Sequence, residues 1–125
     1  MHVIFNADDF GLSPGVNQGI IDACNHGVVH SATVMIGMTA VEQGIQLLPK
    51  APNLALGVHL RLTAGKPLTC APSLTDSNGQ FIVKEQFWQQ AKFDDTELFN
   101  EMCCQVEQFI ATGVALSHLD SHHHV

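Results

Sequence analysis

Leu54-Ala55-Leu56-Gly57-Val58-His59-Leu60 is the stretch that decides the fold. It is an apolar run of strand length, interrupted by a single histidine near its far end. Runs of this length and composition are typical of strands. We therefore predict a strand over 54–60 that carries His59 close to its carboxyl end.

Toward the N-terminus of this strand, further strand and helix patterns alternate. Ser13 followed by Pro14 is an N-cap with proline at the first helical position, and apolar residues then repeat at helical spacing up to Gly27. The first strand runs into a loop in which Asp8 and Asp9 stop the apolar pattern. The predicted elements on this side are a strand over 1–6, a polar loop over 7–11, a helix over 14–26, a strand over 31–36 and a helix over 40–48.

Toward the C-terminus, a long polar segment rich in glycine and proline is predicted to lack regular structure. Loops of this length in compact domains are usually functional or disordered. Asp94-Asp95-Thr96-Glu97 resembles a capping box, which predicts the start of a long helix that Gly113 ends. The predicted elements on this side are an irregular excursion over 63–80, a short helix over 83–90, a helix over 94–112 and a strand over 114–119.

This order of elements predicts parallel βαβ units with right-handed crossovers, and hence an α/β fold. At 125 residues, the chain fits a single α/β domain over 1–125. Three polar clusters fall at the carboxyl ends of predicted strands, the edge at which catalytic groups gather in α/β sheets and barrels. These clusters are Asp8 with Asp9, His59 alone, and Asp120 with His122. One site can therefore collect all three.

The composition disfavours several classes of partner and site. A net charge of −7 with only five Lys and Arg lacks the clustered basic residues of nucleic-acid binding, so no nucleic-acid partner is expected. No apolar run approaches the roughly 20 residues that span a bilayer, so we expect no membrane partner and a cytoplasmic location. The four cysteines have no Cys-x-x-Cys spacing, and we expect buried free thiols and no zinc site built from them.

The C-terminal segment 117–124 places four of the chain's eight histidines within seven residues, beside a carboxylate. Neutral imidazole and carboxylate are ligands that divalent metal ions favour. With Asp9, His59 and His122 as ligands, such an ion keeps open positions for water and a substrate oxygen. Asp8 could then accept a proton from that water, which predicts hydrolytic chemistry.

Simpler interpretations of the same residues remain open. The terminal histidines could be an affinity tag, although three other residues interrupt them. Asp8 and Asp9 could cap the following helix or form an Asx turn. His59 could be a core histidine whose nitrogens are satisfied by hydrogen bonds.

The orientation of the C-terminal side chains also allows alternatives. Asp120 could orient a ligand imidazole or could itself bind the ion. In an extended segment, His118, His122 and His124 would share one face. His123 would then point away from the site.

Three motifs, in this order, resemble the signatures of the YdjC-like carbohydrate deacetylases. They are Asn6-Ala7-Asp8-Asp9-Phe10-Gly11, Gly57-Val58-His59-Leu60-Arg61-Leu62-Thr63 and Ser117-His118-Leu119-Asp120-Ser121-His122-His123-His124. The resemblance implies a TIM-type, (β/α) barrel-like fold. It also implies a metal-dependent enzyme that removes acetyl groups from N-acetylated sugars, with small chito-oligosaccharides such as diacetylchitobiose as substrates.

The resemblance further implies roles for individual residues and for a divalent ion, magnesium or a related ion such as zinc. Water activated by the ion would attack the acetamide carbonyl, and acetate and a free amine would leave. The implied site residues are the metal ligands Asp9, His59 and His122, the base Asp8, the candidate general acid His124, and the supporting residues Asp120 and His118.

Members of this family are longer, and the chain corresponds to the N-terminal half of their fold. Four strands cannot close an eight-stranded barrel, so an exposed edge is expected, which two copies could cover as a homodimer. Two other functions remain open: a catalytically silent metal-binding fragment or interaction module, and another metallohydrolase such as a phosphoesterase. Arg61 is the only basic residue close to the motifs, which disfavours phosphate substrates.

Overall fold

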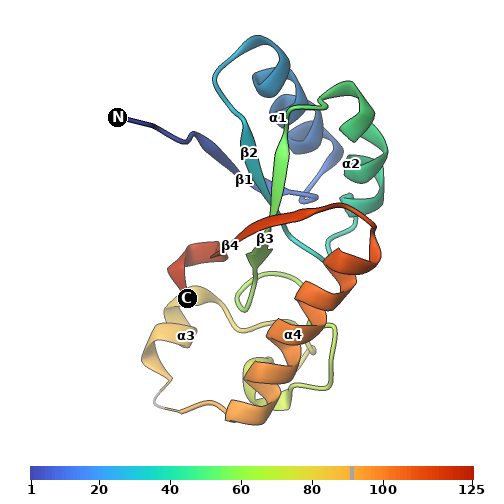
Figure 1. Cartoon of the computed structure of the whole chain (residues 1–125). Coiled ribbons are helices and arrows are strands. Elements are labelled where there is room, and N and C mark those ends of the chain that lie inside the picture. The colour runs from blue at the N-terminus through green and yellow to red at the C-terminus, as the bar shows by residue number, and fades with distance from the viewer. Residues whose placement is uncertain (91) are drawn as a thin grey trace.

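A computed structural model describes residues 1–90 and 92–125 (Figure 1). One sheet of four parallel strands, in the order β1-β2-β3-β4, forms its centre. The strands are β1 (Asn6–Phe10), β2 (Ser31–Val34), β3 (Ala55–Leu60) and β4 (Leu116–Ser121). Helices alternate with the strands along the chain. The predicted α/β fold of parallel βαβ units is therefore confirmed.

Two of the helices, α1 and α4, begin at a residue whose side chain caps the first turn. The Ser13 hydroxyl accepts a hydrogen bond from the Val16 amide, and Pro14 occupies the first turn of α1. Within the described residues, no helix is long and apolar enough to cross a membrane. The helices are α1 (Pro14–His26), α2 (Val41–Leu47), α3 (Lys84–Gln89) and α4 (Asp95–Ala111), with 3-10 turns at Leu48–Lys50, Pro72–Leu74 and His122–His124.

The predicted capping box at the start of α4 forms only in part. The Asp94 carboxylate accepts hydrogen bonds from the backbone amides of Thr96 and Glu97, as an N-cap should. The Glu97 carboxylate does not return to the cap. It accepts from the Ser73 amide at 2.7 Å and so ties the irregular excursion to the helix.

The first strand lies further along the chain than predicted. The strand was predicted over 1–6, but β1 spans Asn6–Phe10, and the five residues before it are exposed and run away from the sheet (Figure 1). Phe10 is completely buried and pairs with Val34, which fixes the strand position. Burial of Phe10 thus outweighs the low strand propensity of the two aspartates.

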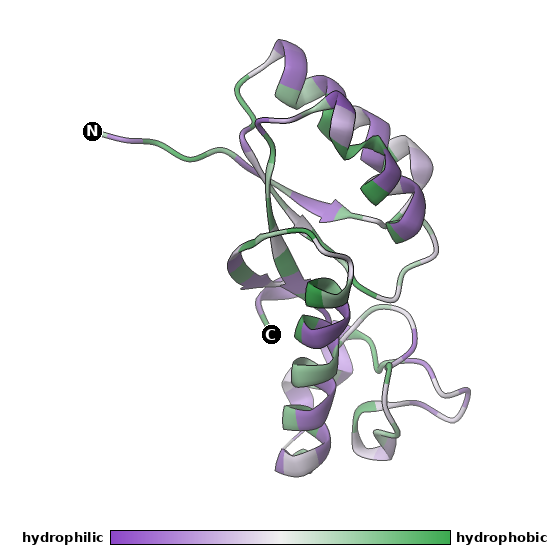
Figure 2. Ribbon diagram, turned by 45° about the vertical axis from the view of Figure 1, so that its right-hand side comes forward, coloured by the Kyte–Doolittle hydropathy of each residue, from purple (hydrophilic) through white to green (hydrophobic). Residues whose placement is uncertain are grey.

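The two faces of the sheet differ in character. The apolar face carries the core, and α1 and α2 lie against it with α4 (Figures 1 and 2). Core side chains from both layers meet there: Phe10, Ile20, Ile21, Ala32, Val34, Ile36, Ala51, Leu56, Val58 and Phe109. The opposite face is polar, since Asn6, Ser31, Thr33, His59 and Asp120 hydrogen-bond with one another across it. The functional candidates therefore lie on a face that does not form the core.

The residues after β4 form a turn and do not continue the strand. β4 ends at Ser121, and His122–His124 turn as a 3-10 helix. His123 (φ 61°) and His124 (φ 57°) adopt left-handed backbone conformations. His118, His122 and His124 therefore do not share one face of a strand.

A buried polar network joins α4 to the end of β3. Gln105 exchanges two hydrogen bonds with the backbone of Arg61, which directly follows the strand. The fully buried Arg61 guanidinium donates to three backbone carbonyls, those of Ile36, Ala64 and Lys66. Burial lowers the pKa of Arg61, and the charge of Glu101 offsets part of that effect. Arg61 thus serves the fold, and its charge is not available to a substrate.

Glu101 completes this network from α4. Its carboxylate accepts hydrogen bonds from the amides of Leu68 and Thr69, from the Thr69 hydroxyl and from Gln105. Glu101 is completely buried. The segment after β3 is therefore held to α4 by charge-assisted hydrogen bonds, the stronger class in proteins.

The cysteines are free, as expected, but they are less buried than predicted. In the part of the chain that the structure describes, none forms a disulfide. Cys70 is exposed, and Cys24, Cys103 and Cys104 are half-buried. Cys70 lies in the irregular excursion, where no helix or strand covers it.

Replacing Glu101 with alanine should destabilise the fold strongly. The change leaves the Leu68 and Thr69 amides, the Thr69 hydroxyl and the Gln105 amide without their acceptor, so the free energy of unfolding should fall by about 2–4 kcal/mol. Urea denaturation followed by circular dichroism measures it. Glu107→Ala, at an exposed position of the same helix, should change it by less than about 0.5 kcal/mol. Equal effects of the two variants would contradict the role of the network.

Candidate metal centre

Three side chains converge at the carboxyl ends of the strands. Asp9 comes from β1, His59 from β3, and His122 follows β4 directly. The Asp9 Oδ1 atom lies 3.4 Å from His59 Nε2 and 3.1 Å from His122 Nδ1, and these two nitrogens are 3.3 Å apart. The structure thus brings together the three residues predicted as metal ligands.

A bulge in β1 directs the side chains of Asp8 and Asp9. The pairing of β1 with β2 shifts register between Ala7 and Phe10, so one extra residue lies in β1 at this point. Bulges of this kind redirect side chains and are common beside active sites. Asp9 takes a left-handed backbone conformation (φ 66°), which is rare outside glycine. Adjacent Asp8 and Asp9 can therefore both line the same cavity.

The hydrogen bonds of His59 fix which nitrogen faces the cluster. A neutral imidazole has one N–H, and the Asp120 carboxylate, 2.6 Å from Nδ1, accepts it. Nε2 therefore presents a lone pair toward Asp9 Oδ1. That oxygen is buried and receives no hydrogen bond within the described residues. Two acceptor atoms, His59 Nε2 and Asp9 Oδ1, therefore face each other with no proton between them. A cation bound between them would stabilise this arrangement.

The separations fit a divalent ion. Bonds of about 2.0–2.2 Å that meet at about 90–110° place neighbouring ligand atoms about 3.0–3.5 Å apart. All three measured separations fall in that range. A carboxylate and two imidazoles suit zinc and its neighbours, and they leave coordination positions open. The residues present therefore fit a bound divalent cation.

Asp120 supports His59 from the neighbouring strand. His59 and Asp120 are paired in the register of β3 and β4, so their side chains lie side by side. The Thr33 hydroxyl donates to Asp120 Oδ2 at 3.0 Å and holds the carboxylate from β2. Carboxylates that orient a ligand histidine in this way are common in metal sites. Asp120 thus contacts the ligand candidate His59 and orients its ring.

A cavity of about 360 Å³ opens beside the cluster. Asp8 and His124 are both exposed, and both line this cavity. Lys84, at the start of α3, contributes a cation to the same wall. A small polar molecule could therefore contact the base candidate and the cluster together.

His118 and His123, the remaining histidines of the C-terminal segment, contribute no atom to the group of three convergent ligand atoms. The His118 ring contacts Asn6 and Ser31 on the polar face of the sheet and does not hydrogen-bond to a ligand candidate. The His123 ring stacks on that of His122, with centroids 3.8 Å apart, and its Nδ1 lies 3.1 Å from the Thr63 hydroxyl. His123, expected to point away, thus packs against a ligand candidate.

Sequence reasoning missed the polar residues that surround the cluster. Thr33 was only part of an apolar strand pattern, although a hydroxyl within that run was an available signal. Asn6 was placed at the end of a strand, whereas it lies at the start of β1. Lys84 reaches the cavity because α3 folds back toward the end of β4, which nothing local in its sequence encodes.

Burial and a neighbouring imidazole lower the pKa of His122. Burial lowers the pKa of His122 below its usual value of 6.5, and the nearby His123 lowers it further. The Asp9 charge acts in the opposite direction and His59 lowers the pKa again. The net effect favours the neutral imidazole, the form that binds metal ions.

Comparison with known proteins identifies close relatives. The family model described as YdjC-like protein matches residues 2–125. A carbohydrate deacetylase of Vibrio cholerae is 52% identical over 124 residues, which cover 99% of this chain and 49% of that protein. A carbohydrate deacetylase of Geobacillus stearothermophilus is 45% identical over 124 residues, 99% of this chain and 50% of that protein.

A solved structure has the same arrangement of elements. The crystal structure of a protein described as a cellobiose-phosphate cleavage protein from Enterococcus faecalis superposes with a TM-score of 0.91 and 40% identity. The superposition covers 98% of this chain and 48% of that chain. The chain therefore spans about half the length of the relatives it matches.

The lowered pKa of His122 predicts how acid affects stability. The unfolded chain binds a proton at His122 more readily than the folded chain, so stability should fall as the pH drops through about 6.5. His122→Asn removes this contribution. In chelator, denaturation midpoints measured between about pH 7.5 and 5.5 should therefore decline less steeply for His122→Asn than for the wild type. The exposed His26→Asn should keep the wild-type slope, and parallel curves for wild type and His122→Asn would contradict the prediction.

Proposed function

The chain belongs to the family of YdjC-like proteins, and on that basis we propose that it acts in the metal-dependent removal of acetyl groups from N-acetylated sugars. The substrates proposed are small chito-oligosaccharides such as diacetylchitobiose. The observation that carries the proposal is the convergence of Asp9, His59 and His122 beside a cavity. The relatives described as carbohydrate deacetylases support the reaction class.

The ligand set would hold one divalent ion, for which we propose magnesium, with zinc as the alternative that the two imidazoles favour. Such an ion supplies Lewis-acid chemistry, since it lowers the pKa of water and polarises a carbonyl. Of the proposed ligands, His59 is the most restrained, because it is buried and Asp120 accepts a hydrogen bond from its Nδ1. Asp9 contributes the negative charge that a dication requires.

Asp8 is the proposed general base. It lies next to the ligand Asp9 in the bulge, but its own carboxylate is exposed in the cavity wall, where it can reach a water molecule. One of its oxygens accepts a hydrogen bond from the Asn6 amide at 2.8 Å. That contact restrains the carboxylate and leaves its second oxygen to take a proton.

His124 is the proposed general acid. It lines the same cavity as Asp8, so the acid and the base could both reach one substrate. A protonated imidazole there would give its proton to the departing amine, which completes acetate release.

Metal binding by the chain tests the ligand assignment. Calorimetric titration with Mg²⁺ and with Zn²⁺ should reveal one site that His59→Ala weakens by at least about 100-fold, because a ligand is lost. The exposed His26→Ala should bind like the wild type. Zn²⁺ binding that survives His59→Ala and disappears in His123→Ala would instead show that the terminal histidines bind metal as a tag does.

Acetate release from diacetylchitobiose tests the reaction. The metal-loaded chain should release acetate, and Asp8→Asn should lower turnover by at least about 100-fold through loss of the base. Metal affinity should stay within a few-fold of the wild type. Asp22→Asn is the matched control, because it makes the same replacement of a carboxylate by an amide at an exposed position of α1. A chain that binds the ion tightly and releases no acetate would favour a silent metal-binding module.

A further inference from the structure

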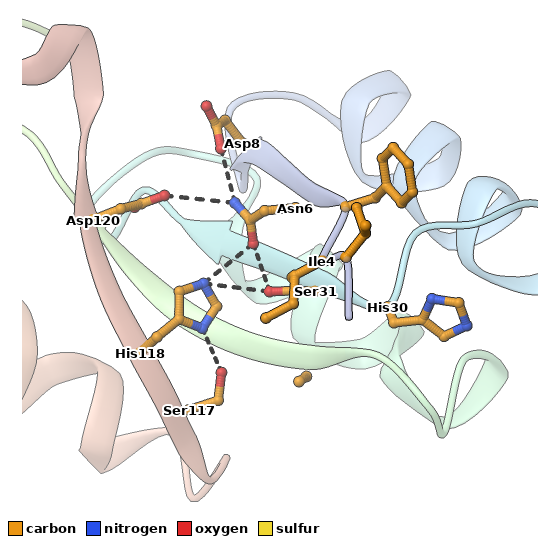
Figure 3. Close-up of a pocket in the computed structure, with 11 residues that line it drawn as sticks. Ile4, Asn6, Asp8, His30, Ser31, Ser117, His118 and Asp120 are labelled. Atoms are coloured by element: carbon orange, nitrogen blue, oxygen red, sulfur yellow. Dashed lines mark hydrogen bonds between the residues drawn. The ribbon is translucent and has the colours of Figure 1, made fainter. Parts of the chain in front are cut away.

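We propose that Asn6 is a positioning residue that holds Asp8 and Asp120 in place from the polar face of the sheet. Asn6 touches neither the cluster of ligand atoms nor the cavity beside it. Its amide lies between the two carboxylates and two further polar residues (Figure 3). The inference rests on the proposed function, because it assigns Asp8 as the base and Asp120 as the partner of a ligand.

The nitrogen of the Asn6 amide faces the carboxylates. Nδ2 donates to Asp8 Oδ1 at 2.8 Å and to the Thr33 hydroxyl at 3.2 Å, and it lies 3.5 Å from Asp120 Oδ2. An asparagine amide has two N–H donors, so one can serve Asp8 while the other serves the Thr33 and Asp120 pair. The base and the carboxylate that orients His59 are thus joined through a single side chain.

The oxygen of the same amide is held on the opposite side. Oδ1 accepts from the Ser31 hydroxyl at 2.6 Å and lies 3.1 Å from His118 Nε2. Because Asn6 Oδ1 can only accept, His118 donates to it from Nε2, and the Ser117 hydroxyl then donates to His118 Nδ1. These contacts determine which end of the amide is nitrogen, and Figure 3 shows Ser31 and His118 grouped on the oxygen side.

The position of His118 depends on the absence of a side chain at Gly57. A Cβ atom built at Gly57 would lie 2.8 Å from the His118 ring and 2.5 Å from its backbone carbonyl. His118 can therefore lie over β3 and reach Asn6 on β1. The role of His118 in this arrangement is to orient Asn6, and three successive contacts, through Asn6 and Asp120, separate His118 from the ligand candidate His59.

An amide is the side chain that this position needs. Asp8 and Asp120 carry like charges, and a neutral donor between them satisfies both without adding a third charge. Aspartate would keep the acceptor for Ser31 and His118 but would lose both donors. Leucine has a similar shape and loses donors and acceptor together, so the two substitutions separate the two halves of the contact.

Asn6→Leu should affect turnover more than binding. The contact to Asp8 is direct and that to His59 passes through Asp120, so we expect kcat to fall at least 10-fold, KM to change less than about 3-fold, and the metal Kd to rise about 3- to 10-fold. Asn6→Asp should lower kcat at least as much. Ser31→Ala, which removes one donor to the Asn6 amide oxygen and a contact to His118 but keeps both Asn6 donors, should give an intermediate loss. Asn53→Leu, at an exposed position before β3, should match the wild type in all three quantities.

The Asn6 amide protons provide a readout that does not require turnover. In 1H–15N spectra of the labelled chain, Asp8→Ala and Ser31→Ala should each shift the Asn6 side-chain amide resonances. The amide of Asn25, which donates to the Lys50 carbonyl far from the site, should not move. Circular dichroism of each variant confirms that it folds.

The outcomes separate the two proposals. If the wild type releases no acetate, the proposed function fails, and the amide shifts and metal Kd still decide the placement of Asn6. Shifts together with a raised Kd would support it. An Asn6→Leu chain with wild-type kcat and Kd, or Asn6 resonances indifferent to Asp8→Ala, would overturn the role of Asn6 and leave the proposed function standing.

Discussion

The hydrogen bond between His59 and Asp120 is the contact on which the site depends. It forms because β3 and β4 are parallel neighbours in a register that pairs these two residues. The 2.6 Å contact takes the only proton of a neutral His59 and leaves its other nitrogen as a bare acceptor facing Asp9. A slip of one residue in β4 would turn Asp120 to the other face and release that proton. The chemistry of the cluster is therefore set by strand pairing as much as by the identity of the ligands.

Stability and function are divided between the two faces of the sheet. The apolar face carries the core, and the Arg61, Gln105 and Glu101 network fixes the segment after β3 against α4. The polar face and the sheet edge at the carboxyl ends of the strands carry the residues with strained backbone conformations. Asp9, His123 and His124, the three non-glycine residues with positive φ in the described chain, all lie at that edge. Backbone strain of this kind costs about 1–3 kcal/mol per residue and persists only where the surrounding structure enforces it.

Much of this arrangement could be predicted from the sequence, because apolar runs and helix caps are local signals. The parallel order followed from them, and with it the meeting of Asp9, His59 and His122 at one edge. Other features could not be predicted, because tertiary contacts decide them. Burial of Phe10 moves the first strand onto Asn6–Phe10, a bulge turns two adjacent aspartates toward one cavity, and left-handed turns at His123 and His124 end the extended segment. The roles of Thr33 and Asn6 likewise depend on neighbours from other strands.

We infer that Asp9, His59 and His122 form one binding site for a divalent ion. Anomalous diffraction from crystals of the chain soaked in Mn²⁺ tests it most directly, because it locates the ion without reference to activity. We expect a single strong peak about 2.0–2.3 Å from Asp9 Oδ1, His59 Nε2 and His122 Nδ1. A peak at the exposed His124 alone, a peak between Asp8 and Asp120, or no peak at saturating Mn²⁺ would contradict it.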